Sequence, residues 1–184
     1  MAQVDESEVR RLVREAVERA LARPSAVPGP AAGGRKRVAI GADHGGYALK
    51  EVLKRFIAEE LDWEVHDCGT HSGEAVDYPD YAAAVGRAVA SSECGRGIVV
   101  DAAGIGSTMA ANKIPGVRCA LCHDDATVRN AREHNDANVL ALGARVVNRG
   151  LATRMVRLFL ATPFGGGRHE RRVQKIMALE RGAG

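Results

Sequence analysis

The sequence predicts an α/β protein: a three-layer, doubly wound, five-stranded parallel sheet of Rossmann-like type, preceded by an amphipathic helix on a flexible linker. Two observations lead to this fold class. Short apolar, β-branched runs alternate with segments of helical periodicity from about residue 37 onward, which indicates a parallel sheet covered on both faces. The chain of 184 residues, 46% hydrophobic and 27% charged, is also long enough to bury a core and ordinary in composition for a globular protein.

Residues 1–23 form a unit of their own. Apolar side chains recur there at helical spacing and make one stripe: Val9, Leu12, Val13, Ala16, Val17, Ala20 and Leu21. Pro24 ends the predicted helix, and residues 24–36 form a linker rich in Pro, Gly and Ala. A tethered amphipathic helix is suited to docking on an external partner. The alternative is that it packs on its own domain or pairs with a sister subunit.

The globular domain, residues 37–184, is expected to follow the strand–helix alternation in order. Strands are predicted where short apolar runs occur, at residues 37–41, 64–68, 97–101, 117–121 and 138–142. Helices are predicted from helical periodicity or runs of small residues at 47–61, 80–90, 124–133, about 149–161 and 168–181. A further helix should start after Gly106, and the helix over 124–133 should end before His134.

The run Gly97–Lys113 is the centre of the predicted site. Its β-branched strand ends on Asp101, and Gly104 and Gly106 lead into the start of a helix. In an α/β fold this order brings backbone N–H groups together at a helix N-terminus, where anionic ligands bind. Asp101 would stand at the lip of this pocket, in the place of a catalytic base. The alternative is that Asp101 only caps the helix.

Two more clusters are expected to meet this loop at the carboxyl edge of the sheet, the edge where the strands end. They are Asp43–Gly46, after the first strand, and His134–Asp136, before the fifth. A fourth cluster, Gly166–Val173, opens the last helix. Its Arg168 and Arg172 are four residues apart and share a helix face, so their guanidinium groups suit a phosphate; a solvated basic face is the alternative.

Several classes of function are disfavoured. A net charge of +3 is too small to indicate nucleic-acid binding, and no apolar run is long enough to span a membrane. With no visible signal peptide, we expect the cytosol and reduced cysteines. Cys119–His123 matches a haem-attachment pattern but lies within a buried-strand pattern, so no metal or other cofactor is expected. Gly104 and Gly106 lack the third glycine of a dinucleotide fingerprint.

Five segments together resemble the ribose-5-phosphate isomerase B family, which includes the galactose-6-phosphate isomerase subunits. In chain order they read GADHGGYALKEVL, DYPDYA, GIGSTMAANKIPGVRCAL, REHNDANVLALGARV and GGRHERRV, and they cover residues 37 to about 177. The resemblance implies a metal-independent aldose–ketose isomerase that acts on a sugar phosphate. It also implies a homodimer or homotetramer with active sites shared between subunits.

The resemblance also implies roles for individual residues. Asp43 and His44 would bind the sugar, and His44 or His134 would assist ring opening, with His134 as the acid–base partner. Asn135 would hold sugar hydroxyls. The phosphate would be bound by Arg145, Arg168 and Arg172. The enediolate oxygen would be stabilised by the amides of the loop and by the helix start that follows it, namely Ala102, Ala103, Gly104, Ile105, Gly106 and Ser107.

The chain departs from the family pattern at the expected base. Many members have Cys at the position of Asp101, another branch has Glu at the position of Ser107, and a Thr or Ser is usual at Ala103. Asp101 is the natural substitute for moving a proton between C1 and C2, although a carboxylate is a weak base unless burial raises its pKa. The alternatives are a catalytically weak sugar-phosphate-binding, sensor or scaffold homologue, or an isomerase of a hexose 6-phosphate.

The N-terminal helix and linker resemble the encapsulation peptides of bacterial microcompartments. This resemblance implies that residues 5–22 dock on the shell or on other cargo, and that the protein works in the microcompartment lumen. The predicted function is therefore the interconversion of ribose 5-phosphate and ribulose 5-phosphate through an enediolate, with Asp101 as base. No nucleic acid or membrane is expected among its partners.

Overall fold

The computed structural model describes residues 36–180, and its five-stranded parallel sheet confirms the predicted fold class. The strand order is β2-β1-β3-β5-β4. The strands are β1 (Arg37–Ala42), β2 (Glu64–Asp67), β3 (Arg96–Asp101), β4 (Cys119–Leu121) and β5 (Val139–Gly143). The helix predicted at residues 1–23 lies outside the described residues, as do the linker up to residue 35 and residues 181–184.

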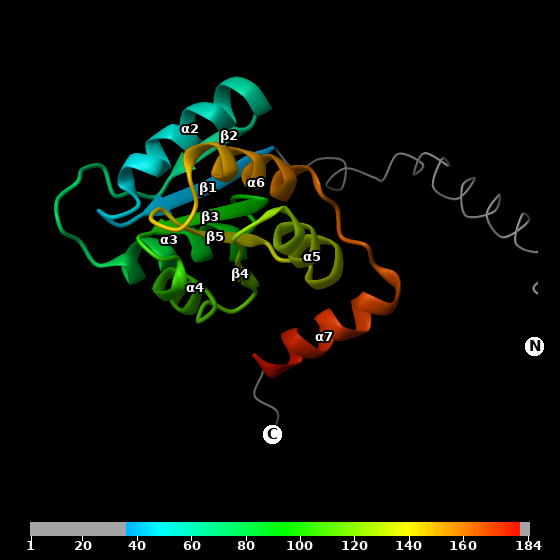
Figure 1. Ribbon diagram of the computed structural model, residues 1–184. Coiled ribbons are helices and arrows are strands. Elements are labelled where there is room, and N and C mark those ends of the chain that lie inside the picture. The colour runs from blue at the N-terminus through cyan, green and yellow to red at the C-terminus, as the bar shows by residue number, and fades with distance from the viewer. Residues whose placement is uncertain (1–35, 181–184) are drawn as a thin grey trace, which may run out of the picture.

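Helices cover both faces of the sheet (Figure 1). One face carries α2 (Tyr47–Leu61), α5 (Asp125–Asn135) and α6 (Arg149–Ala161), and the other carries α3 (Tyr78–Ala90) and α4 (Ile105–Ala111). Each face has its own apolar core, one centred on Leu53, Met155 and Phe159 and the other on Val85 and Val99. The last helix, α7 (Glu170–Leu179), follows a 3-10 turn at Gly167–His169 and lies beyond α5, away from the sheet (Figure 1).

The ligand crevice expected of this fold, called the crevice below, lies between β1 and β3. These two strands are neighbours in the sheet, with Ala42 opposite Val100 in register. The helices that follow them, α2 and α4, leave to opposite faces, which is the arrangement that opens a ligand crevice at the carboxyl edge. Gly46 lets the two loops approach closely, because a Cβ there would lie 2.2 Å from the carbonyl oxygen of Val100.

A buried ion pair fixes the loop that follows β2. The side chain of Lys50 on α2 is fully buried, and its Nζ donates to both carboxylate oxygens of Asp67 at 2.7 and 2.9 Å. Asp67 also accepts a hydrogen bond from the amide of Gly69 at 2.9 Å. The carbonyl of Gly69 in turn accepts from the amide of Ala42 at 2.7 Å, so the pair anchors the end of β1 beside the crevice.

Several predicted helix boundaries are wrong. Helix α3 begins at Tyr78 and not at residue 80, and α4 begins at Ile105, before Gly106. Two further differences affect the candidate site. The helix predicted at 124–133 continues through His134 and Asn135, because its C-cap is Asp136, which has φ 45° and donates its N–H to the carbonyls of Ala131 and Arg132. The last helix begins as a 3-10 turn that contains Arg168, so Arg168 and Arg172 lie on either side of a junction and not on one α-helix.

The sheet ends in a short edge strand, β4. The side-chain amide of Asn112, at the end of α4, donates to the carbonyl of Cys119 at 2.9 Å and accepts from its amide at 2.8 Å. Asn112 therefore occupies the place that a further strand would take beside Cys119. No helix in the described part of the chain is long and apolar enough to cross a membrane.

Candidate active site

Residues from three loops gather at the crevice, and we call them the carboxyl-edge cluster: Asp43, His44, Asp101, residues 102–107 and Arg145. The loops are in direct contact, since the amide of Asp43 donates to the carbonyl of Val100 and the amide of Arg145 donates to the carbonyl of Ala102 at 3.0 Å. The strand ends of β1, β3 and β5 therefore bring these residues together.

The Asp101 carboxylate is buried at the centre of this cluster and is held by backbone amides. One oxygen accepts hydrogen bonds from the amides of Ala103, at 2.8 Å, and Gly104. The other oxygen accepts from the amide of Ser107 at 2.9 Å. Three of the amides expected to stabilise an enediolate are thus bound to Asp101.

These hydrogen bonds set the ionisation of Asp101. Burial raises the pKa of the carboxyl group, but hydrogen bonds from Ser107 and from the amides of Gly104 and Ala103 lower it by more, so the net shift is downward. The carboxylate is therefore ionised at neutral pH, and its affinity for a proton is reduced. Burial alone would have raised the pKa and made Asp101 a stronger base.

The other members of the carboxyl-edge cluster differ in exposure. Asp43 is buried, and its Oδ1 accepts a hydrogen bond from the amide of Gly46 at 2.9 Å. His44 is exposed, and its Nδ1 lies 3.2 Å from the carbonyl oxygen and 3.3 Å from the amide nitrogen of Val76. Arg145 is exposed at the rim. The imidazole of His44 and the guanidinium of Arg145 are therefore the exposed polar side chains of the carboxyl-edge cluster.

The remaining predicted site residues form a second cluster elsewhere. We call it the amino-edge cluster: His134, Asn135, Arg168, His169 and Arg172. The rings of His134 and His169 are stacked, with centroids 4.1 Å apart and planes within 5°. The segment before Arg168 is tied to α5 through the amide of Gly165, which donates to the carbonyl of Glu133 at 2.9 Å. Arg168 and Arg172 are both exposed.

The prediction that His134–Asp136 meets Asp101 at the carboxyl edge is wrong within one chain. Because β5 is parallel to its neighbours, the segment that precedes it lies at the opposite, amino edge. Asp101 pairs with Gly143, and Val139 pairs with Gly97, so the sheet alone separates the two edges by about 13 Å at the usual rise of a strand.

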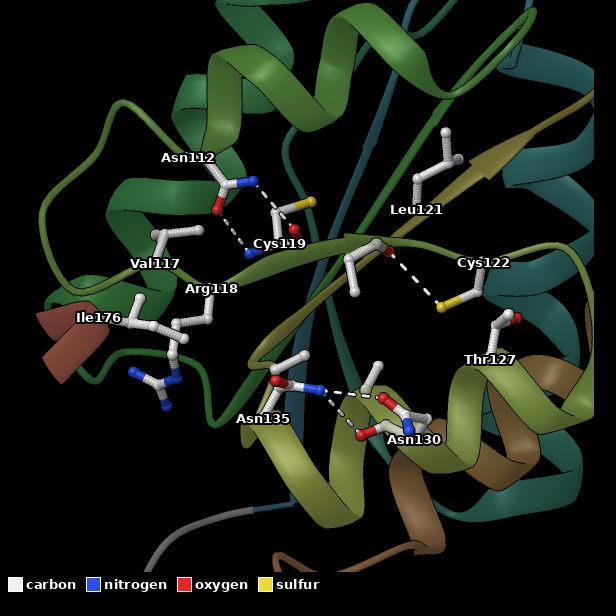
Figure 2. A pocket seen from close by; sticks show the side chains of 13 residues that line it. Asn112, Val117, Arg118, Cys119, Leu121, Cys122, Thr127, Asn130, Asn135 and Ile176 are labelled. Carbon is white, nitrogen blue, oxygen red and sulfur yellow. Dashed lines mark hydrogen bonds between the residues drawn. The ribbon is translucent and has the colours of Figure 1, made fainter. Parts of the chain in front are cut away.

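A groove of about 440 Å³ adjoins the amino-edge cluster (Figure 2). Its walls come from β4, α5 and α7, and Asn130, Asn135 and Ile176 are among the side chains that line it. It is separate from the crevice between β1 and β3.

Exposed apolar side chains also lie on α4, where Ile105 is 52% and Met109 63% exposed.

In the described part of the chain, the cysteines and acidic residues form no metal centre. Among residues 36–180, no three His, Cys, Asp or Glu side chains lie close enough together to hold a metal ion. Cys119 begins β4, Cys122 follows it, and both are buried. Burial raises the pKa of the Cys119 thiol to about 12 and that of Cys122 to about 11, so neither is available as a thiolate.

Sequence patterns assign no role to two residues here, His169 of the amino-edge cluster and its neighbour Asn130. His169 was part of a matching motif but had no assigned function, and its ring covers that of His134. Asn130 lies 3.0 Å from Nδ1 of His134. The signal for Asn130 was its position four residues before His134, a spacing that places two side chains on the same face of a helix.

Known proteins share this fold, and their sequences align with most of the chain. The family model described as Ribose/Galactose Isomerase matches residues 38–176. Ribose-5-phosphate isomerase B of Escherichia coli strain K12 is 43% identical over 145 residues, which are 79% of this chain and 97% of that protein. The solved structure of Clostridium thermocellum ribose-5-phosphate isomerase B is 50% identical, with a TM-score of 0.77, and the match covers 79% of this chain and 97% of that one. For the type B ribose 5-phosphate isomerase of Trypanosoma brucei, identity is 46% and the TM-score 0.76, over 79% and 99% of the two chains.

Similarity at this level, over nearly the full length of each relative, defines the class of protein as an aldose–ketose isomerase. The chain belongs to the ribose/galactose isomerase family.

Proposed function

We propose that this protein interconverts ribose 5-phosphate and ribulose 5-phosphate. The observation that carries the proposal is the contact, at the carboxyl edge of the sheet, between the loops that bear a buried carboxylate, a histidine and an arginine. This sheet is shared with ribose-5-phosphate isomerases of type B. The amino-edge cluster supplies the rest of the expected chemistry, with two further guanidinium groups for the phosphate and His134 for ring opening.

We also propose that each active site combines residues of two copies of the chain. The two clusters lie at opposite edges of one sheet, so a single copy cannot present both to one sugar. Exposed Ile105 and Met109 on α4, together with an apolar groove that Asn135 lines, support contact with a second copy. If α4 of one copy enters the groove of the other, the carboxyl-edge cluster of the first approaches the amino-edge cluster of the second.

In the proposed reaction, a proton leaves C2 of the open-chain aldose and returns to C1 of the enediolate. Asp101 is the proposed base, and its position at the end of β3 supports this role. The lowered pKa of Asp101 makes its carboxylate a weaker acceptor for the C2 proton. More of the barrier must then be lowered by positioning and by hydrogen-bond donors around the enediolate oxygens. The first-turn amides of Ile105 and Gly106 have no acceptor within α4, because they open that helix.

A second candidate function is sugar-phosphate binding with little turnover. The specific observation in its favour is that Asp101 already occupies the amides of Ala103, Gly104 and Ser107. A carboxylate held in this way acts as an anionic cap of the loop, and it competes with the enediolate for the same donors. Under this reading the arginines and His134 would still bind the ligand.

The experiment that separates these functions follows hydrogen exchange at C2 by proton NMR. Ribose 5-phosphate and a panel of pentose and hexose phosphates are incubated with the protein in deuterated water. Isomerisation with loss of the C2 proton signal supports the enzyme, and the preferred sugar identifies the substrate. Saturable binding without exchange supports the second candidate. No binding of any sugar phosphate would contradict both.

We further propose that residues 5–22 recruit the enzyme to a bacterial microcompartment. The apolar stripe from Val9 to Leu21 and the Pro-rich linker support this role. Deletion of residues 1–34 should leave turnover intact and abolish co-assembly with shell protein. Loss of activity or of the oligomer in the deletion would favour packing within the enzyme instead.

A further inference from the structure

The side chains of Asn130, His134 and Asn135 on α5 form a chain of hydrogen bonds. Its donors and acceptors can be assigned from one contact with a backbone carbonyl. The side-chain nitrogen of Asn135 lies 3.2 Å from the backbone carbonyl oxygen of Asn130, which can only accept. Asn135 Nδ2 is therefore a donor. The same nitrogen lies 3.0 Å from Oδ1 of the Asn130 side chain, which must accept from it. Figure 2 shows both contacts.

The orientation of Asn130 determines which ring nitrogen of a neutral His134 carries the proton. With Oδ1 facing Asn135, the Nδ2 of Asn130 is the atom that lies 3.0 Å from Nδ1 of His134. An amide nitrogen donates and does not accept, so Nδ1 of His134 must carry a lone pair and no proton. The proton of the neutral imidazole is then on Nε2, which has no acceptor among residues 36–180.

The second histidine of the amino-edge cluster, His169, favours its own neutral form. His169 stacks flat on His134, with ring centroids 4.1 Å apart, and its Nε2 accepts from Nε of Arg168 at 3.4 Å. Desolvation, together with the charges of His134, Arg168 and Arg172, lowers the pKa of His169. The nearby positive charges therefore disfavour a protonated His169, because like charges repel at this distance.

We propose that Asn130 is a positioning residue that holds His134 as the neutral Nε2–H tautomer. This inference rests on the proposed function, in which His134 faces the sugar of a neighbouring copy. A neutral imidazole with its proton on Nε2 donates a hydrogen bond to a sugar oxygen as charge develops on it, which is an electrophilic role also known for histidine in other isomerisations. Asn135 takes part through its bond to Asn130, in addition to any contact with the sugar.

The test is nitrogen-15 NMR of the full-length protein with labelled histidine, because the two ring nitrogens have distinct shifts when protonated and when bare. The His134→Gln variant identifies the His134 signals. In the unsubstituted protein we expect a bare Nδ1 and a protonated Nε2 wherever the ring is neutral. In Asn130→Asp, whose carboxylate can only accept, we expect the proton to move to Nδ1. Arg129→Leu, at an exposed neighbouring position on the same helix, should leave the signals unchanged.

Kinetics provide the second readout. At about pH 9, where histidine is ordinarily neutral, Asn130→Asp should lower kcat about 100-fold, as expected for the loss of one donor to the developing charge, and change KM by less than about threefold. Arg129→Leu should match the unsubstituted enzyme. A protonated Nδ1 in the unsubstituted protein, or an unchanged tautomer in Asn130→Asp, would overturn the inference. If no variant or parent exchanges the C2 hydrogen while the NMR assignment holds, the proposed function fails and the tautomer stands.

Discussion

The Asp101 carboxylate accepts a hydrogen bond from the amide of Ser107 at 2.9 Å, and this contact joins the end of β3 to the first turn of α4. The sequence left two roles open for Asp101, catalytic base and helix cap. The geometry shows a capping contact, and the same side chain stands where the base of the reaction is expected. The two roles are therefore not exclusive, and they predict different responses to substitution.

Substitution of Asp101 by Asn should separate the capping role of this side chain from its proposed role as base. An amide keeps one acceptor oxygen and turns an NH₂ group toward a backbone N–H, so we expect the free energy of unfolding to fall by about 1–3 kcal/mol. If Asp101 is also the base, the rate of C2 hydrogen exchange should fall at least about 100-fold. Urea unfolding and proton NMR measure the two effects. Exchange at an equal and appreciable rate in both proteins would show that Asp101 is not the base.

Asp101→Cys provides the matched comparison, because the family resemblance implies Cys at this position in many members. The thiol cannot accept three amide hydrogen bonds as a carboxylate does, so the loop amides become available to the substrate. We expect exchange to persist in Asp101→Cys at least at the level of the unsubstituted chain. A complete loss of exchange with retained folding would indicate that the rest of the site has adapted to a carboxylate.

Complementation tests the shared active site. Asp101→Asn removes a residue of the carboxyl-edge cluster, and His134→Gln removes one of the amino-edge cluster. A mixed dimer of the two variants keeps one site with both native residues. Mixing two inactive variants should therefore restore about one quarter of the parental activity, given symmetric dimers and random exchange. Activity that stays at the level of the separate variants would contradict sharing.

Met109→Glu should weaken the association of two copies. Met109 is 63% exposed on α4, and a charge placed in an apolar interface loses hydration without gaining a partner. We expect the dissociation constant to rise about tenfold or more in analytical ultracentrifugation. Ala58→Glu is the control, since Ala58 is exposed on α2, on the other face of the sheet. An equal effect of both substitutions would place the interface elsewhere.

The ion pair of Lys50 with Asp67 should make stability depend on acid pH. Burial raises the pKa of Asp67, but hydrogen bonds from Lys50, Lys54 and Gly69 lower it by more. The net effect is a pKa that falls from 3.8 to about 2. A folded pKa below the unfolded one means that the stabilisation is present in full above about pH 4 and is lost as the pH falls toward about 2. After allowance for solvent screening, the loss should be about 1–2 kcal/mol.

Asp67→Asn supplies the comparison for this prediction. It should be less stable than the parent at neutral pH, because Lys50 would remain buried without its partner. The difference in the free energy of unfolding between parent and variant should shrink below about pH 4. Urea denaturation at a series of pH values measures it. A difference that does not change with pH would show that Asp67 acts only through packing.

The sequence predicted the architecture well because the fold depends on local periodicity. The helix at Tyr47–Leu61 has the predicted bounds, and the strand ending at Asp101 ends there in the structure. The helix with His134 was predicted too short, because the residues that end it act through backbone conformation. Asp136 ends the helix by adopting a left-handed conformation, which a side-chain pattern does not reveal.

The candidate site was predicted only in part, for two physical reasons. Asp101 and Arg145 follow adjacent strands and so meet, as a strand pattern implies. His134 precedes a strand and therefore lies at the amino edge of the sheet. The order of the motifs along the chain does not by itself display this separation. The pKa of Asp101 depends on which amides its oxygens accept from, and this is determined by the backbone geometry of the turn at Gly104.

Asn112 has a consequence for how copies of this chain can assemble. Its side-chain amide binds both the amide and the carbonyl of Cys119, so the outer side of β4 is already hydrogen-bonded at that residue. A strand from another molecule would have to displace Asn112 before it could extend the sheet. We therefore expect neighbouring copies to meet through helices and side chains and not by pairing at β4, and the β4 border of each sheet to resist strand-to-strand aggregation.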